Sequence, residues 1–409
     1  MIARLPSSDE TFDRIDALIQ AGLRLARSAP SGRILLARIA DSIDLEWIPR
    51  PWGEDIAAEL EAANSQAREK MAPRHIERIL SDAWGTQPAN ELDELEPEPV
   101  AVTVSSQVHR GVLDSSPVAV KVLRPGLASS VRQDLALLEG LLAPLGAAFP
   151  SLDSGAVVRE FRERVLDELD LEHEATAQRR FHRALRNHPF LVVPAPVMRL
   201  THESVLVTEW LDGLPLWQAP NPDEAAARLV VFLLGSLRAG IIHADPHPDD
   251  VLVLDDGRLA ILDFGATRTV QAERVESAAA ALEAFAADDA DELGAALERL
   301  GALPASHAPT LLDILSDGLG DLAGAEPARL DSEAVLGARD RLFARPRQLS
   351  EVIGAGAMPP EDLWPARGSV QLFATIARVG ATGPWRELTR AALRDGWAAD
   401  LDSAIAYES

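Results

Sequence analysis

Residues 243–250 are HADPHPDD, and residues 262–265 are LDFG. Between them, residues 251–254 and 259–262 are apolar runs that predict two short strands, and Asp255-Asp256-Gly257 supplies the turn chemistry of a hairpin. The pattern therefore places three carboxylates on two loops that a hairpin joins.

An HxDxxxxN pattern, a hairpin and then DFG is typical of a kinase-type phosphoryl-transfer centre. In that pattern the first Asp lies near the nucleophile, and the two later positions bind metal. Here they are Asp245, Asp250 and Asp263, and position 250 departs from the pattern, which has Asn. An Asp is still an oxygen ligand for Mg²⁺, but it crowds like charges, so we expect one raised pKa, retained metal dependence and slow turnover.

A lysine precedes these carboxylates in Val118-Ala119-Val120-Lys121-Val122. The valines alternate onto one face of a strand and leave Lys121 on the other. Alone, this pattern indicates a solvated strand lysine. Followed by the carboxylates in the right order, it predicts a lysine that reaches nucleotide phosphates. His243 and His247 flank Asp245, and we expect them to hold the loop by hydrogen bonds rather than to bind a transition metal.

Composition excludes some functions. The chain has 409 residues, 47% hydrophobic and 25% charged, with a net charge of −25, which is an ordinary globular composition with room for two or three cores. The negative field disfavours nucleic acid and anionic membrane surfaces as partners. The absence of cysteine rules out disulfides and thiol metal sites. The start lacks an apolar signal core, and we interpret the apolar run 229–242 as a buried helix, not a membrane span.

The order of predicted elements indicates an α+β, bilobal protein-kinase-like fold with a helical N-terminal extension. We expect the extension over residues 1–95, a kinase-like N-lobe with inserted helices over 96–212, and a mainly helical C-lobe with the catalytic and metal loops over 213–409. The acidic run 91–99 is interpreted as a linker. The other predicted elements are strands at 100–104, 108–113, 118–123, 192–197 and 205–210, and helices at 129–145 and 155–185.

Several segments together resemble a known family, the UbiB/ADCK (AarF-type) atypical kinase-like proteins associated with isoprenoid quinone biosynthesis and lipid homeostasis. The resemblance covers about residues 90 to 270. It rests on the HADPHP and LDFGATR segments already described and on SQVH at 106–109, VAVK at 118–121, RPG at 124–126, ELD at 168–170, EA at 174–175, NHPF at 187–190 and EWLDG at 209–213.

The resemblance implies an ATP site with Mg²⁺. Lys121 would bind the phosphates and Asp245 would occupy the catalytic-loop position, while Asp250 and Asp263 would hold the metal. Spacing alone does not choose among the helix acids, but the resemblance makes Glu174 the partner of Lys121. The remaining implied residues are Thr103 and Val104 in the nucleotide loop, Glu168 with Asp170 in an ExD motif facing the N-terminal extension, and Glu209 to Leu211 as the adenine hinge.

The chain departs from the family at two further places. The KxGQ motif of the family's extension has its nearest counterpart in Arg38-Ile39-Ala40-Asp41, which keeps a cation and loses Gly and Gln. The nucleotide loop at residues 101–109 has no Gly, so we expect it to be stiffer than a Gly-rich loop.

Three functions stay open from the sequence. The first is an ATP-dependent ATPase or phosphotransferase linked to isoprenoid quinone or lipid metabolism; the second is a pseudokinase that binds nucleotide or docks a partner. The third is a small-molecule phosphotransferase of the aminoglycoside or choline kinase type. Expected partners are a nucleotide, an isoprenoid or lipid-like molecule and a protein, with no nucleic acid and no transmembrane segment. The expected location is cytoplasmic, with membrane contact only through a partner.

Overall fold

The computed structural model describes residues 69–103, 105–127, 169–324, 326–357 and 359–399, with isolated positions at 54, 58, 129, 159, 166 and 401. The first lobe is built on one antiparallel sheet of order β1-β2-β3-β5. Its elements are α4 (Pro73–Trp84), η2 (Pro88–Asn90), β1 (Glu94–Val102), β2 (Ser106–Leu113), β3 (Ser116–Leu123), α7 (Leu171–Ala184), η3 (Met198–Leu200) and β5 (Val205–Glu209). The short strand β4 (Leu191–Val192) follows α7 in the chain but pairs with a strand of the second lobe at Leu259 and Ala260.

The second lobe is mainly helical. Its elements are β6 (Leu214–Pro215), η4 (Leu216–Gln218), α8 (Pro222–Arg238), β7 (Ile241–His243), η5 (Pro248–Asp250), β8 (Val251–Val253), β9 (Leu259–Ile261), β10 (Thr267–Thr269), α9 (Ala272–Ala286), α10 (Ala290–Leu300), η6 (Ala305–His307), α11 (Ala308–Leu319), η7 (Gly320–Ala323), β11 (Ala328–Leu330), α12 (Ser332–Phe343), α13 (Pro346–Ala355), η8 (Pro360–Asp362), α14 (Leu363–Val379), β12 (Ala381–Gly383), α15 (Trp385–Asp395) and η9 (Gly396–Ala398).

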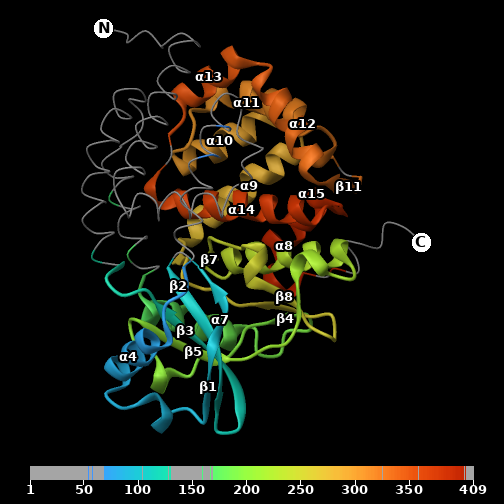
Figure 1. The fold of residues 1–409 in the computed structure, drawn as a ribbon. Coiled ribbons are helices and arrows are strands. Elements are labelled where there is room, and N and C mark those ends of the chain that lie inside the picture. Colours follow the sequence, from blue (N-terminus) through green and yellow to red (C-terminus); the bar gives the residue numbers. More distant parts are fainter. Residues whose placement is uncertain are drawn as a thin grey trace.

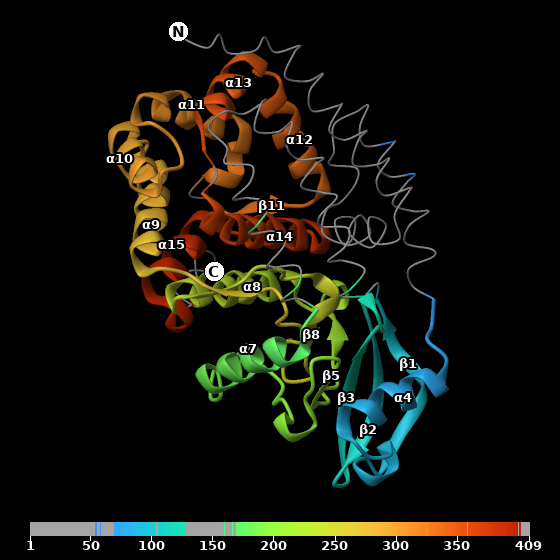
Figure 2. The same ribbon diagram turned by 90° about the vertical axis from the view of Figure 1, so that its left-hand side faces the viewer.

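In space, the two lobes lie at opposite ends of the described part of the molecule. This arrangement confirms the predicted bilobal kinase-like α+β fold. Figures 1 and 2 show β1, β2 and β3 with α4 at one end and the helices from α9 onward at the other, with α7 and α8 between them. The short strands β7 to β10 lie where the lobes meet, so the loops that carry the carboxylates open toward the sheet.

The sheet has one face against α4 and one face toward the second lobe. Val118, Val120 and Val122 are buried against Ile76 and Leu80 of α4. Lys121 lies between Val120 and Val122 in β3, so its side chain points to the opposite face of the sheet, the face that it shares with its register partners Val108 and Leu206. The alternation predicted for this strand is confirmed.

Helix α7 joins the cores of the two lobes. Its first turns contribute Leu171 and Ala175, which pack against Leu123 and Leu206 of the sheet. Its last turns contribute Phe181 to the core of the second lobe, where α8 also packs. The helix is therefore fixed at both ends by burial of apolar side chains.

The predicted hairpin is confirmed, since β8 and β9 pair antiparallel from Val251 with Ile261 to Val253 with Leu259. Gly257 lies in the turn between them with φ +82°, a conformation that favours glycine. The hairpin sets the direction in which both flanking loops leave the sheet.

Four predicted elements are wrong in part. Residues 91–99 are not a linker, because β1 starts at Glu94 and its prolines sit at register irregularities of an edge strand. The strand at 192–197 is shorter, because Pro194 and Pro196 have no N–H to donate. The apolar run 229–242 is helical only to Arg238, and its end forms β7.

The fourth correction concerns the long helix predicted over residues 155–185. Its C-terminal part is a separate helix, α7, because Asp170 has extended backbone angles. The Asp170 carboxylate accepts from the backbone N–H groups of Glu172 and His173 at 2.9 and 3.3 Å and caps the new helix. The helix predicted at 129–145 lies outside the described residues, apart from position 129.

Candidate active site

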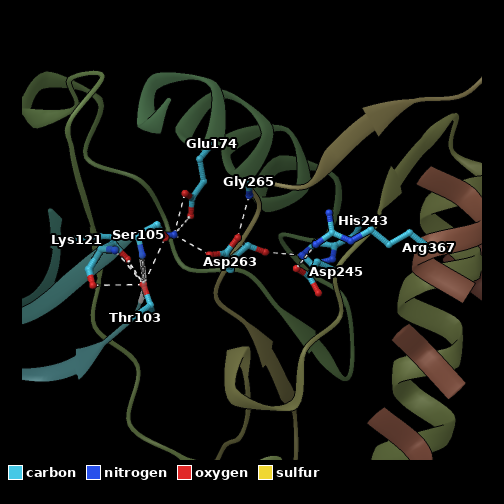
Figure 3. Close-up of polar contacts among 10 residues, drawn as sticks. Thr103, Ser105, Lys121, Glu174, His243, Asp245, Asp263, Gly265 and Arg367 are labelled. Atoms are coloured by element: carbon cyan, nitrogen blue, oxygen red, sulfur yellow. Dashed lines mark hydrogen bonds and ion pairs between the residues drawn. The ribbon is translucent and has the colours of Figure 1, made fainter. Parts of the chain in front are cut away.

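Lys121 lies between two carboxylates from different parts of the chain. Its Nζ is 2.8 and 2.9 Å from the two carboxylate oxygens of Glu174 on α7 and 2.6 Å from Oδ2 of Asp263 (Figure 3). Glu174 is buried, and the side chains of Lys121 and Asp263 are 19% and 35% exposed. The three groups form one charge cluster between the lobes.

The position of Glu174 follows from the start of α7. Because Asp170 caps the helix, Leu171, Glu174, Ala175, Gln178 and Phe181 share its buried face. On the same face of α7, Gln178 Nε2 donates to the backbone carbonyl of Pro194 at 2.8 Å. This hydrogen bond ties the helix to the segment that follows β4. Glu174 is thus the one acid on this face that points at Lys121, a choice that sequence spacing alone does not make.

Asp263 is positioned by the turn after β9 and by its buried neighbour. Its Oδ1 accepts from the Gly265 N–H at 2.9 Å. Phe264 is fully buried, with its ring centroid 5.0 Å from that of Phe181 on α7 and 5.3 Å from that of His243. A buried aromatic next to Asp263 therefore fixes the backbone from which the carboxylate projects.

The two histidines hold the loops by hydrogen bonds, as the sequence predicted. Burial lowers the pKa of His243, so the ring is neutral near pH 7, and its Nε2 donates to the backbone carbonyl of Asp263. His247 Nδ1 accepts from the Asp249 N–H at 3.3 Å. No cluster of three or more His, Asp or Glu groups suited to a metal occurs among the described residues.

The charge cluster shifts the pKa of each member. For Lys121, burial opposes the charge, but Asp263 and Glu174 more than offset it and the pKa is raised. Burial, and then the Asp263 charge, raise the pKa of Glu174 to about 7. Burial also opposes ionisation of Asp263, yet Lys121 and the Gly265 N–H hold its pKa below the usual range. The cluster therefore keeps a lysine cation and an Asp263 anion in contact.

Asp250 ends the short η5 helix and faces the same cluster. Its pKa is raised well above the usual value by burial first and then by the charges of Asp263, Asp245 and Asp249. Within the described chain no side chain donates a hydrogen bond to its carboxylate. Asp250 and Asp263 are close enough to affect each other electrostatically, and such a pair could hold Mg²⁺, which takes one or two protein carboxylates and completes its shell with phosphates and water.

Asp245 receives partners that the sequence did not predict. Arg367 Nη2 lies 2.7 Å from Asp245 Oδ2, and Gln371 Nε2 lies 3.0 Å from Oδ1 (Figure 3 shows the arginine). Both side chains come from α14, more than a hundred residues later in the chain. The only signal in the sequence was the i, i+4 spacing of Arg367 and Gln371, which places both side chains on one face of this helix.

The nucleotide loop between β1 and β2 is held by hydrogen bonds among its own residues. Thr103 Oγ1 accepts from the N–H groups of Ser105 and Ser106 at 3.3 and 2.9 Å, and the Thr103 N–H donates to the Ser106 carbonyl at 2.9 Å. These bonds link the two ends of the turn, and the stiffness expected from the absence of Gly stays a prediction. Val104 and Glu168 lie outside the described residues, and so does the segment 38–41.

The predicted hinge, Glu209 to Leu211, follows directly from β5. The Glu209 N–H donates to the carbonyl of Ala195 at 2.9 Å, and the Trp210 N–H donates to that of Pro117 at 3.2 Å. The strand ends at Glu209, and the chain enters the second lobe past Gly213, where a Cβ would lie 2.9 Å from the Val253 carbonyl. These residues therefore form the connection between the lobes.

The SQVH and RPG segments tie the chain before α4 to the sheet. Buried Gln107 accepts from the Met71 N–H at 2.8 Å, and its amide contacts His109 Nε2 at 2.8 Å. Arg124 donates to the Glu69 and Thr103 carbonyls at 2.7 and 3.2 Å. The segments thus join the nucleotide loop to the described end of the N-terminal extension.

A sheet lysine paired with a helix glutamate, a loop with HxD and a DFG turn, all placed between two lobes, define a kinase-like protein. A model of the ABC1 atypical kinase-like domain matches residues 64–297, which is more than half of the chain. The chain therefore belongs to the ABC1 atypical kinase-like family.

Its relatives are larger proteins. Uncharacterized protein sll0005 of Synechocystis is 32% identical over 63% of this chain and 40% of its own length. Probable protein kinase UbiB of Marinobacter nauticus is 30% identical over 50% of this chain and 41% of its own length. Protein ACTIVITY OF BC1 COMPLEX KINASE 1, chloroplastic, of Arabidopsis thaliana is 29% identical over 55% of this chain and 35% of its own length. The chain spans about half or less of the length of these relatives.

A solved structure supports the fold over nearly the whole chain. The Rv3197–erythromycin complex from Mycobacterium tuberculosis superposes with a TM-score of 0.64 and 22% identity, covering 96% of this chain and all of that one. At this identity the likeness concerns the fold alone. In the part of the chain that the structure describes, no helix is long and apolar enough to cross a membrane.

Proposed function

We propose that the chain binds ATP with Mg²⁺ between its lobes and acts as a kinase-like ATPase or phosphotransferase. A kinase-like domain implies nucleotide binding in general. The observation that carries the finer proposal is the contact of Lys121 with both Glu174 and Asp263. This contact unites a phosphate-binding cation with a metal-binding carboxylate at one point.

Each residue has a proposed role. Lys121 binds the α- and β-phosphates while Glu174 holds its Nζ in place. The Thr103–Val104 turn covers the phosphates, and the backbone of Glu209 to Leu211 meets adenine. Asp245 orients the hydroxyl or water that receives the phosphoryl group. Asp250 and Asp263 hold Mg²⁺, which supplies neutralisation of phosphate charge during transfer.

The predicted domain limits become part of the proposal. Residues 1–95 are the extension, with Glu168 and Asp170 facing it, 96–212 are the N-lobe and 213–409 are the C-lobe. The start of β1 at Glu94 supports a boundary between the extension and the N-lobe near residue 95. The proposed acceptor is an isoprenoid or lipid-like molecule, in line with family members named UbiB, and the proposed location is cytoplasmic or peripheral to a membrane through a partner.

Hydrolysis of ATP by wild type and by Asp263→Ala tests this function. Loss of the Asp263 carboxylate removes both a metal ligand and the anion that positions Lys121. We expect Mg²⁺-dependent phosphate release to fall by about 100-fold or more. Equal rates for the two proteins, at the level of buffer alone, would instead support the pseudokinase alternative.

A further inference from the structure

One face of α14 follows the loop that carries Asp245. Four of its side chains contact this loop, at spacings of i, i+4, i+8 and i+11 that fall on one helix face. Arg367 and Gln371 bind Asp245, Thr375 Oγ1 donates to the carbonyl of Pro246 at 2.7 Å, and Arg378 approaches His247 at 3.5 Å.

The backbones of the helix and the loop are also close. A Cβ added at Gly368 would lie 3.2 Å from Ala244 Cα and 3.2 Å from the His243 carbonyl oxygen. A larger residue at this position would push α14 away from the loop. The polar contacts of the neighbouring Arg367 therefore depend on a glycine that lets the two backbones approach.

Both oxygens of the Asp245 carboxylate are engaged by α14. Arg367 and Asp245 are 28% and 29% exposed, so their ion pair is partly shielded from water. The Arg367 guanidinium also lies 4.9 Å from the ring centroid of Trp364, which is buried. A planar cation stacked on a fixed ring loses little freedom when it binds a carboxylate, so the contact is preorganised.

We propose that Arg367 and Gln371 are positioning residues for phosphoryl transfer, and that α14 is part of the reaction centre. They hold the Asp245 carboxylate at one rotamer, with the orientation needed to receive the acceptor hydroxyl or water. They act through Asp245 and do not touch the nucleotide. This inference rests on the proposed function, because it assigns Asp245 a role in the transfer.

A double-mutant cycle on ATP hydrolysis tests the inference. Arg367→Met is expected to lower kcat by about 10- to 100-fold with KM for ATP changed by less than about threefold, and Arg367→Lys to restore part of the rate. In an Asp245→Asn background, Arg367→Met should change kcat by no more than about twofold, since the residue acts through the carboxylate. Equal losses in both backgrounds would contradict the proposal.

The matched control is Val370→Ala. Val370 lies on the same helix and is 59% exposed, away from the contacts with Asp245. We expect its kcat and KM to equal those of wild type. A loss as large as that of Arg367→Met would mean that any change in α14 disturbs the site, and would overturn the assignment of Arg367.

A second measurement does not depend on activity. Amide hydrogen exchange of residues 243–250 should become faster in Arg367→Met and Gln371→Ala, but not in Val370→Ala, while the melting temperature stays near that of wild type. Unchanged exchange in both variants would contradict positioning by α14. If wild type hydrolyses no ATP, the proposed function fails, and the exchange result still decides whether α14 orders the loop.

Discussion

At the scale of single residues, the proposed site is a cluster of opposite charges. Lys121 is shared between Glu174 and Asp263, and Asp250 adds a carboxylate whose pKa is raised. Under the proposed function, the phosphates of ATP would add negative charge, and Mg²⁺ and Lys121 would offset it. We therefore expect Asp250, where the kinase pattern has Asn, to make the balance of charges more dependent on a bound metal.

Exchanging Asp250 for Asn tests this dependence. In metal-free buffer, Asp250→Asn should raise the free energy of unfolding by about 1–2 kcal/mol, because it removes a carboxylate crowded by like charges. At saturating Mg²⁺ the difference should shrink, since the cation stabilises wild type. Urea unfolding with and without Mg²⁺ measures both. Asp249→Asn is the control, because the Asp249 side chain is 60% exposed. If the difference in free energy of unfolding between wild type and Asp250→Asn were the same with and without Mg²⁺, a metal at position 250 would be contradicted.

The raised pKa of Glu174 predicts a pH dependence of stability. Its pKa is about 7 when folded, above the usual 4.5, so between these values the native state binds more protons than the unfolded state. Stability must then fall as pH rises through this window, by an amount on the order of 2 kcal/mol. Asp263, whose pKa is lowered, loses its contribution only at more acidic pH.

Glu174→Gln should flatten this slope between pH 4.5 and 7 in the nucleotide-free protein. Urea unfolding at several pH values compares the two proteins, with Glu172→Gln as an exposed single-charge control on the same helix. The same downward slope in Glu174→Gln would assign the dependence to another group.

At the scale of elements, two helices from distant parts of the chain fix the site. Helix α7 brings Glu174 to Lys121, and α14 brings Arg367 and Gln371 to Asp245. The strands and the hairpin were predictable, because alternation and turn residues are local signals. The start of α7 was missed since Asp170 was not recognised as a cap, and the role of α14 was missed because no local pattern reports a contact across more than a hundred residues.

Close helix packing can be tested at a buried glycine. A Cβ at Gly235 of α8 would lie 2.3 Å from a ring carbon of Trp397 and 2.9 Å from its backbone nitrogen. Gly235→Ala should therefore lower the free energy of unfolding by about 1–3 kcal/mol despite the better helix propensity of Ala. At Gly337 of α12 the nearest atom is the end of the Arg341 side chain at 3.2 Å.

Gly337→Ala is the matched control for this prediction. The flexible Arg341 can move, so the substitution should be neutral or stabilising by up to about 1 kcal/mol. Denaturant unfolding compares both variants with wild type. If Gly235→Ala were as stable as Gly337→Ala, the close approach of α8 and η9 would not be a feature of the folded protein.

At the scale of the whole molecule, the chain is a bilobal kinase-like protein with a net charge of −25. The family and the fold could be predicted from ordered motifs such as Lys121, HxD and DFG, whose sequence order matches their order in the site. Composition alone does not indicate how an acidic chain would bind ATP, the proposed ligand. In the structure Lys121 contacts the carboxylates of Glu174 and Asp263 between the lobes, and under the proposed function a divalent cation would offset their charge.

Calorimetric titration of ATP with and without Mg²⁺ tests the central claim most directly. We predict that wild type binds ATP with Mg²⁺ and that the affinity falls by at least about tenfold when the metal is chelated. Asp263→Ala should lose this metal dependence, and Asp249→Asn should keep it. Binding of equal affinity with and without Mg²⁺ in wild type, or no binding in either condition, would contradict an Mg²⁺-ATP site at Lys121, Asp250 and Asp263.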